Sequence, residues 1–123
     1  MIVRAFGMSL VAALCLSAGA ALAEFAKVSD AATFKQLITG KQLVRPLVRL
    51  ELSPEGQING TGVTWDVTGN WSWREGYFCR DLNWGGSDLG YNCQEVAIKD
   101  GRIRFISDKG QGDYADFRLN PVD

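Results

Sequence analysis

Residues 63–82, VTWDVTGNWSWREGYFCRDL, decide the fold class of this chain. Apolar and polar residues alternate along this stretch with a period of two, which is typical of strands that bury one face. Gly69-Asn70 and Glu75-Gly76 interrupt the alternation with residue types that favour turns. The stretch therefore predicts neighbouring antiparallel strands.

The same period extends toward the N-terminus. Residues 43–52 predict a first strand, and Pro46 makes it an edge or bulged strand because proline has no N–H for the ladder. Asn59-Gly60 predicts a tight hairpin turn between Gln57-Ile58 and residues 63–68. In the first strand one face would carry Val44, Pro46, Val48, Leu50 and Leu52, and the other Arg45, Arg49 and Glu51.

Toward the C-terminus, residues 91–99, 102–107 and 114–119 predict three further strands, which Asp100-Gly101 and the loop 108–113 connect. The total is seven or eight strands. Hairpins with one apolar face each must bury that face, so we expect a small antiparallel meander barrel or a sandwich, mainly β.

One short helix is expected before the strands, within residues 28–40. Ser29 or Asp30 would cap its first amide groups, and Gly40 would end it. Four apolar residues fall at helical spacing, so one side of the helix would cover an end of the sheet: Ala31, Phe34, Leu37 and Ile38.

The first residues have the pattern of a secretory signal. Arg4 precedes an apolar stretch at residues 8–16, and Ala21-Leu22-Ala23 ends in small residues. We therefore expect a signal peptide at residues 1–23 and a single domain at residues 24–123, located in the periplasm or secreted. After cleavage no membrane span is expected, although a retained anchor at residues 5–23 is the alternative.

Cys79 and Cys93 are the cysteines that remain after residue 23. In an oxidising compartment they predict one disulfide. Closing a loop of about fifteen residues would stabilise so small a domain by about 3 kcal/mol.

The composition excludes several functions. The chain has no histidine, so it lacks the base of a Ser-His-Asp or Cys-His system and an imidazole metal ligand. We expect no metal and no cofactor. Without Arg4 the 13 basic residues become 12 against 14 acidic ones, a net charge of −2. This balance of charges predicts no positive electrostatic potential that would attract nucleic acid or an anionic bilayer.

The tryptophans of the central strands share one face. Trp65, Trp71 and Trp73 have the same parity as Val63 and Val67. Their position predicts core filling, and a ligand cavity lined with indole rings is the alternative.

The segment between the cysteines, residues 83–92, is the strongest candidate for a contact surface. It mixes aromatic residues with glycines in a loop that the disulfide would hold, and aromatic residues are frequent at interface hot spots. The candidate binding residues are Trp84, Asp88 and Tyr91, toward a protein, a glycan or a small apolar ligand. The alternative is a structural loop that covers the disulfide.

Acid chemistry is the one catalytic route that the composition leaves open. A glycan hydrolase needs two carboxylates at a set separation, and four acids flank the aromatic segment: Glu75, Asp81, Asp88 and Glu95.

Two other charged groups are expected to be solvated surface. The spacing of Asp108, Asp113 and Asp116 matches no calcium loop and predicts a turn. The arginines could bind an anionic partner, but such residues more often form an outer face with their stems packed on the sheet: Arg45, Arg49, Arg102 and Arg104.

Residues 76–82, 84–94 and 102–108, with Gly110 and Gly112, resemble a group of short secreted bacterial proteins of unknown function. The resemblance covers nearly the whole chain after the signal. Members of that group often carry the name dihydrodipicolinate reductase, which implies a pyridine-nucleotide enzyme. This chain departs from such an enzyme because it is short, lacks histidine and has no Gly-x-Gly-x-x-Gly turn. No catalytic residue is carried over.

These observations favour an exported, non-enzymatic binding module. A small carboxylate-dependent glycan hydrolase and a purely structural envelope domain are the alternatives.

Overall fold

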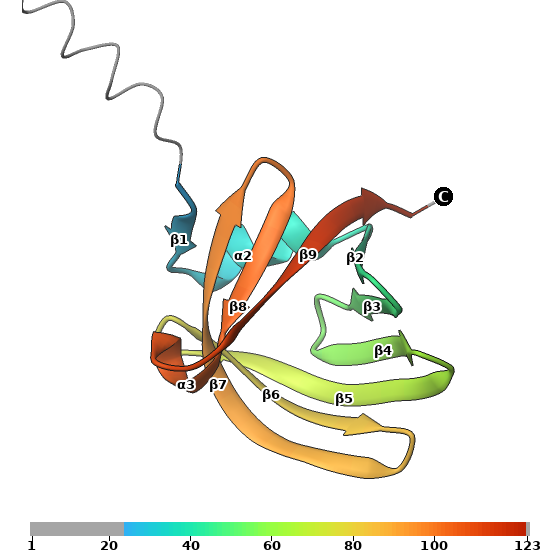
Figure 1. Cartoon of the computed structure of the whole chain (residues 1–123). Coiled ribbons are helices and arrows are strands. Elements are labelled where there is room, and N and C mark those ends of the chain that lie inside the picture. Colours follow the sequence, from blue (N-terminus) through green and yellow to red (C-terminus); the bar gives the residue numbers. More distant parts are fainter. Residues whose placement is uncertain (1–23, 123) are drawn as a thin grey trace, which may run out of the picture.

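The computed structural model describes residues 24–122, so the predicted signal peptide lies outside the described residues. They form nine strands and two short helices (Figure 1). In chain order the elements are β1 Ala26–Val28, α2 Ala31–Ile38, β2 Lys41–Arg45, β3 Val48–Leu52, β4 Gln57–Gly62, β5 Trp65–Arg74, β6 Tyr77–Trp84, β7 Ser87–Lys99, β8 Arg102–Ile106, α3 Ser107–Gly110 and β9 Tyr114–Pro121.

Eight of the strands close into an antiparallel barrel. The sheet order is β1-β7-β6-β5-β4-β3-β2-β9-β8, and the additional pairing of β7 with β8 closes the ring. The long strand β7 also pairs with β1, which therefore lies outside the ring. The predicted antiparallel barrel is confirmed, and the sandwich is not formed.

The prediction of one strand over residues 43–52 was wrong. The chain reverses at Pro46-Leu47, and β2 and β3 pair antiparallel with Leu43 opposite Leu50. Val44 and Arg49 share a face, so the predicted division into faces fails as well. Proline favours the first central position of such a turn, but Leu47 occupies the second at a φ of 67°, which leucine rarely adopts, so the usual glycine or asparagine is missing there.

The predicted hairpin turn at Asn59-Gly60 was also wrong. Both residues lie inside β4, and the turn falls at Val63-Thr64. Gly60 instead allows β4 to lie close to β3, because a Cβ at this position would lie 2.0 Å from the Arg49 carbonyl oxygen. β5 likewise continues through Gly69-Asn70 without a break.

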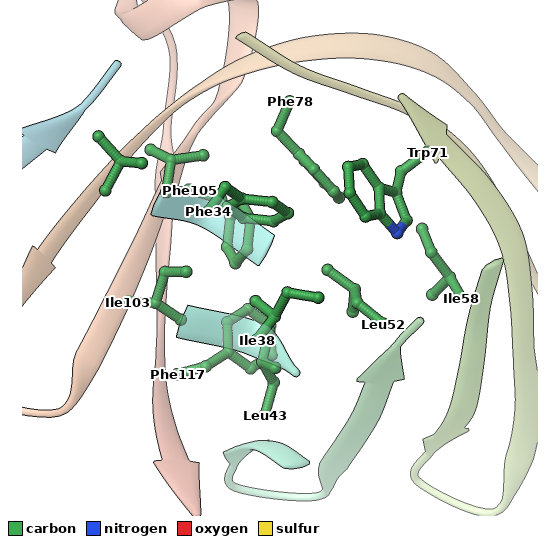
Figure 2. Packing of buried hydrophobic residues seen from close by; sticks show 12 residues of the cluster. Phe34, Ile38, Leu43, Leu52, Ile58, Trp71, Phe78, Ile103, Phe105 and Phe117 are labelled. Atoms are coloured by element: carbon green, nitrogen blue, oxygen red, sulfur yellow. The ribbon is translucent and has the colours of Figure 1, made fainter. Parts of the chain in front are cut away.

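The predicted helix is confirmed as α2. The Asp30 side chain accepts a hydrogen bond from the Thr33 amide and caps the first turn. Phe34 and Ile38 point from the helix into the barrel and are fully buried (Figure 2). The aromatic residues around Phe34 come from β5, β6 and β8, so the helix and three strands share one core.

No helix within residues 24–122 has the length and apolar character needed to cross a bilayer.

Candidate functional site

A cavity of about 280 Å³ lies inside the barrel. Most of its wall is apolar, because inward-facing side chains of β2, β3, β4, β6, β8 and β9 line it: Leu43, Leu50, Leu52, Ile58, Phe78, Leu82, Phe105, Ala115 and Phe117. The polar part of the wall consists of Arg80, Gln94, Ser107, Asp113 and Tyr114. Tyr114 is exposed, so the cavity reaches the surface near the junction of α3 with β9.

Arg80 is the charged group of this cavity. It lies between Phe78 and Leu82 on the inward face of β6 and is paired with Trp71 of β5. Its Nη1 donates a hydrogen bond of 2.8 Å to the Gly90 carbonyl oxygen. Burial lowers the pKa of this guanidinium, and the neighbouring Asp81 carboxylate acts in the opposite direction.

No carboxylate among the described residues forms an ion pair with Arg80. The single ion pair found in residues 24–122 joins Arg104 to Asp116 at 2.7 Å on the outer face. Because a half-buried guanidinium with one backbone acceptor keeps most of its donors free, the cavity presents a positive group to whatever enters it.

A hydrogen-bond network fixes the polar side of the cavity. Gln94 Nε2 donates to Asn92 Oδ1 at 3.1 Å and to Ser107 Oγ at 3.3 Å. The Asp108 amide also donates to Asn92 Oδ1. The network connects β7 to α3, so it holds the cavity's polar wall in place.

The Cys79–Cys93 disulfide is present, as predicted. The two residues face each other across β6 and β7, with Cα atoms 3.9 Å apart. The segment between them is not a loop: it consists of paired strands joined by the two-residue turn Gly85-Gly86. The sequence of this segment shows no regular alternation of apolar and polar residues. A register shift between Leu82 and Asn83 also interrupts the ladder.

The structure divides the three candidate binding residues between two faces of this hairpin. Trp84 lies over the end of β4, where its Nε1 donates to the Gly62 carbonyl oxygen at 2.9 Å. Asp88 pairs with Asn83 on the other face, and Tyr91 pairs with Asp81. The Tyr91 hydroxyl lies 3.5 Å from the Cys93 sulfur. Trp84, Asp88 and Tyr91 therefore do not form one patch.

The four candidate acids are likewise separated. Asp81 and Asp88 line a polar hollow on the outer face of β4 to β7, together with Asn59, Thr68 and Asn83. Glu75 lies in the β5–β6 turn. Glu95 lies beside Gly110, because a Cβ on that glycine would meet the Glu95 carboxylate. Of the four acids, only Asp81 and Asp88 share a site.

The aspartates of the C-terminal segment have separate partners. Asp108 Oδ1 accepts from Asn92 at 2.8 Å, Asp116 pairs with Arg104, and Asp113 lines the cavity. The hydrogen bond from Arg104 lowers the pKa of Asp116, and the charges of Arg102 and Arg45 lower it further. Residues 24–122 contain no cluster of three His, Cys, Asp or Glu side chains able to hold a metal ion.

The prediction that the tryptophans fill the core is confirmed for Trp71 and Trp73 and wrong for Trp65. Trp71 is buried and Trp73 packs against the same cluster. Trp65 instead lies at the barrel rim, with its ring centroid 6.0 Å from that of Trp84. The cavity exists, but aliphatic side chains and phenylalanines line it rather than indole rings.

The sequence did not single out Arg80. The signal available was its parity, because a charge at the inward position between Phe78 and Leu82 breaks the apolar face of β6.

Comparisons of the chain with family models, with curated proteins and with solved structures each found no match.

Proposed function

We propose that this protein is an exported, non-enzymatic binding module that holds a small ligand inside its barrel. The ligand class is an amphiphile with an apolar body and an anionic head group, such as a carboxylate. The observation that carries the proposal is Arg80, a half-buried guanidinium without an ion-pair partner in a mainly apolar cavity, whose polar wall also includes Asp113. The Cys79–Cys93 disulfide is compatible with an exported protein.

The size and chemistry of the cavity both favour this class. Its volume of about 280 Å³ is close to the lower end of small-molecule pockets, which span about 300–1,000 Å³. Arginine binds carboxylates through a planar fork of N–H donors. A guanidinium left unpaired in such a place is costly, and an anionic head group would offset that cost.

Arg80→Gln is expected to weaken the binding of octanoate about tenfold or more, because it removes a charge-assisted hydrogen bond from the cavity. Titration calorimetry with the purified protein measures this effect. Octanol, which has the same chain without the charge, should bind both proteins with similar affinity.

The matched control is Arg74→Gln, because Arg74 is an exposed arginine of β5 outside the cavity. It should leave octanoate binding unchanged. Octanoate affinity that is equal in the Arg80→Gln variant and the original protein would contradict the proposed ligand class.

The outer hollow supports a second candidate, a glycan-binding or carboxylate-dependent glycan-hydrolysing surface. Besides Ile58, Gly69 and Leu82, its lining has amides, a hydroxyl and two carboxylates, which suit a polyhydroxylated ligand: Gln57, Asn59, Thr68, Asn70, Asp81, Asn83 and Asp88. The exposed Tyr91 pairs with Asp81 and offers a ring for stacking.

Replacing Asp81 and Asp88 together by asparagine tests this second candidate. Loss of binding to peptidoglycan fragments, or of their hydrolysis, is expected if the two carboxylates hold the sugar. Glu55→Gln with Glu75→Gln is the control, since it removes two exposed acids outside the hollow. Unchanged binding and hydrolysis in the aspartate variant would reject the glycan site.

A further inference from the structure

The β2–β3, β4–β5 and β6–β7 turns lie at the right of Figure 1. Four exposed apolar side chains belong to these turns or to the strand ends beside them. We call Leu47, Val63, Trp65 and Trp84 the apolar rim. Their exposed fractions are 74%, 51%, 54% and 37%, respectively. Exposed apolar residues that cluster, rather than lie singly, mark an interaction surface.

The apolar rim is held rigidly. The Val63 amide donates to the Leu47 carbonyl oxygen at 2.7 Å, which connects the β2–β3 and β4–β5 turns. Trp84 Nε1 donates to the Gly62 carbonyl oxygen, and the Trp65 and Trp84 rings pack edge to face. The three turns therefore present their side chains as one unit.

The backbone at two rim positions is unfavourable for the residues it carries. Leu47 and Val63 have φ values of 67° and 60°, a region in which glycine or asparagine is common and a β-branched residue is an outlier. Each side chain is also exposed to solvent, so neither packing nor backbone conformation explains an apolar residue there. Such strain concentrates at functional positions.

Arginines border this rim. Arg45, Arg49 and Arg118 line a hollow beside the β2–β3 turn together with Leu47 and Val63, and the Arg45 guanidinium also lies 5.7 Å from the centroid of the Phe117 ring. All three arginines are exposed, and none takes part in the one ion pair found within residues 24–122. The nearest acids are Glu51, which follows Arg49 on the same face of β3 and lines a neighbouring hollow with it, Asp66, across Thr61 from Arg49, and Asp116, which Arg104 already engages.

Arg102 of β8 extends this basic border. It pairs directly with Arg118 of β9, which in turn stands opposite Val44 of β2. The fold thus gathers positive charge from segments far apart in the sequence. A chain with a small net negative charge acquires a local basic surface in this way.

We propose that the apolar rim and its bordering arginines dock on the surface of an anionic phospholipid bilayer. Leucine, valine and tryptophan side chains at protruding turns suit the boundary between headgroups and acyl chains, where indole rings concentrate. The arginines beside them meet the lipid phosphates. The combination of apolar tips with flanking cations distinguishes a charged bilayer from a purely apolar protein partner. The proposal does not depend on the cavity, because Arg80 is not part of the rim.

The test uses protein that a bacterial host has exported, with loss of the apolar N-terminal residues verified by mass spectrometry. Co-sedimentation compares vesicles of mixed phosphatidylcholine and phosphatidylglycerol with vesicles of phosphatidylcholine alone. We expect binding to the mixed vesicles and at least about tenfold weaker binding to the neutral ones, since several arginines face the surface.

Two variants separate the charged and the apolar contributions. Arg45→Gln with Arg118→Gln should weaken binding to mixed vesicles about tenfold or more. Leu47→Asn with Val63→Asn should weaken it by a similar factor of about ten, while the fold is retained because asparagine tolerates positive φ. Lys35→Gln with Arg74→Gln, the control with the same loss of charge away from the rim, should bind like the original protein.

Brominated acyl chains add a direct readout, because they quench tryptophan that reaches the acyl boundary. We expect quenching that Trp65→Phe reduces. Absence of binding, equal binding to both vesicle types, or equal loss in the control variant would overturn the proposal. Sedimentation without vesicles tests whether a second copy of this chain covers the apolar rim instead. Self-association that the Leu47→Asn with Val63→Asn variant abolishes would make the rim an interface between copies, and it would also overturn the proposal.

Discussion

Phe34→Ala is expected to lower the free energy of unfolding by about 3–5 kcal/mol, because truncating a fully buried phenylalanine removes apolar contact and leaves a cavity. Phe34 is the centre of the aromatic core (Figure 2). Its ring centroid lies 5.0 Å from Trp73, 5.1 Å from Trp71 and 5.3 Å from Phe78. Its loss would therefore detach α2 from the strands that it covers.

Urea unfolding followed by tryptophan fluorescence measures this loss, and the melting temperature should fall by at least about 12 °C. Lys35→Ala is the matched control, since Lys35 is the exposed neighbour on the same helix. It should change the free energy of unfolding by less than about 0.5 kcal/mol. Equal effects of the two variants would mean that α2 does not belong to the barrel core.

Removing the disulfide is expected to have the second-largest effect. Cys79→Ala with Cys93→Ala opens a bridge that spans 14 positions of the chain. On the chain-entropy model this lowers the free energy of unfolding by about 3 kcal/mol. Since small domains have about 5–15 kcal/mol in total, the variant would unfold at a clearly lower urea concentration.

Reduction provides the control for this variant. A thiol reductant should lower the stability of the original protein by a similar amount and leave the alanine variant unchanged. If the reductant destabilises both proteins equally, its effect does not act through the Cys79–Cys93 bridge.

Local pattern predicted the elements that short-range physics governs. The alternation around Trp71 and Phe78 indicated strands, and the cap at Asp30 with Phe34 and Ile38 at helical spacing indicated α2. These signals are local because side-chain parity and capping depend on neighbouring residues alone.

The turns at Glu75-Gly76 and Asp100-Gly101 were predicted correctly, whereas two other turns were not, for the opposite reason. The chain reverses at Leu47 and Val63, residues that seldom adopt positive φ, whereas Gly60 lies within a strand that passes close to Arg49. Contacts with the neighbouring turn and strand decide these conformations. Turn propensity alone cannot encode them.

The candidate site was predicted only in outline. The sequence pointed to the cysteine-bracketed segment with Trp84, Asp88 and Tyr91, which the structure distributes over two faces of a hairpin. Arg80 also lies between the two cysteines, before residues 83–92, but was passed over, because its position inside the cavity depends on closure of the whole barrel.

By itself, the sequence determined the strand-rich class, the capped helix and the cysteine pair, because each depends on spacing along the chain. Only the tertiary structure decided where charge and apolar surface meet. Arg45, Arg49 and Arg118 become neighbours through strand pairing, and Arg80 faces inward because eight strands close into a ring. Net charge counts residues without regard to position, whereas binding depends on how pairing across the barrel arranges them in space.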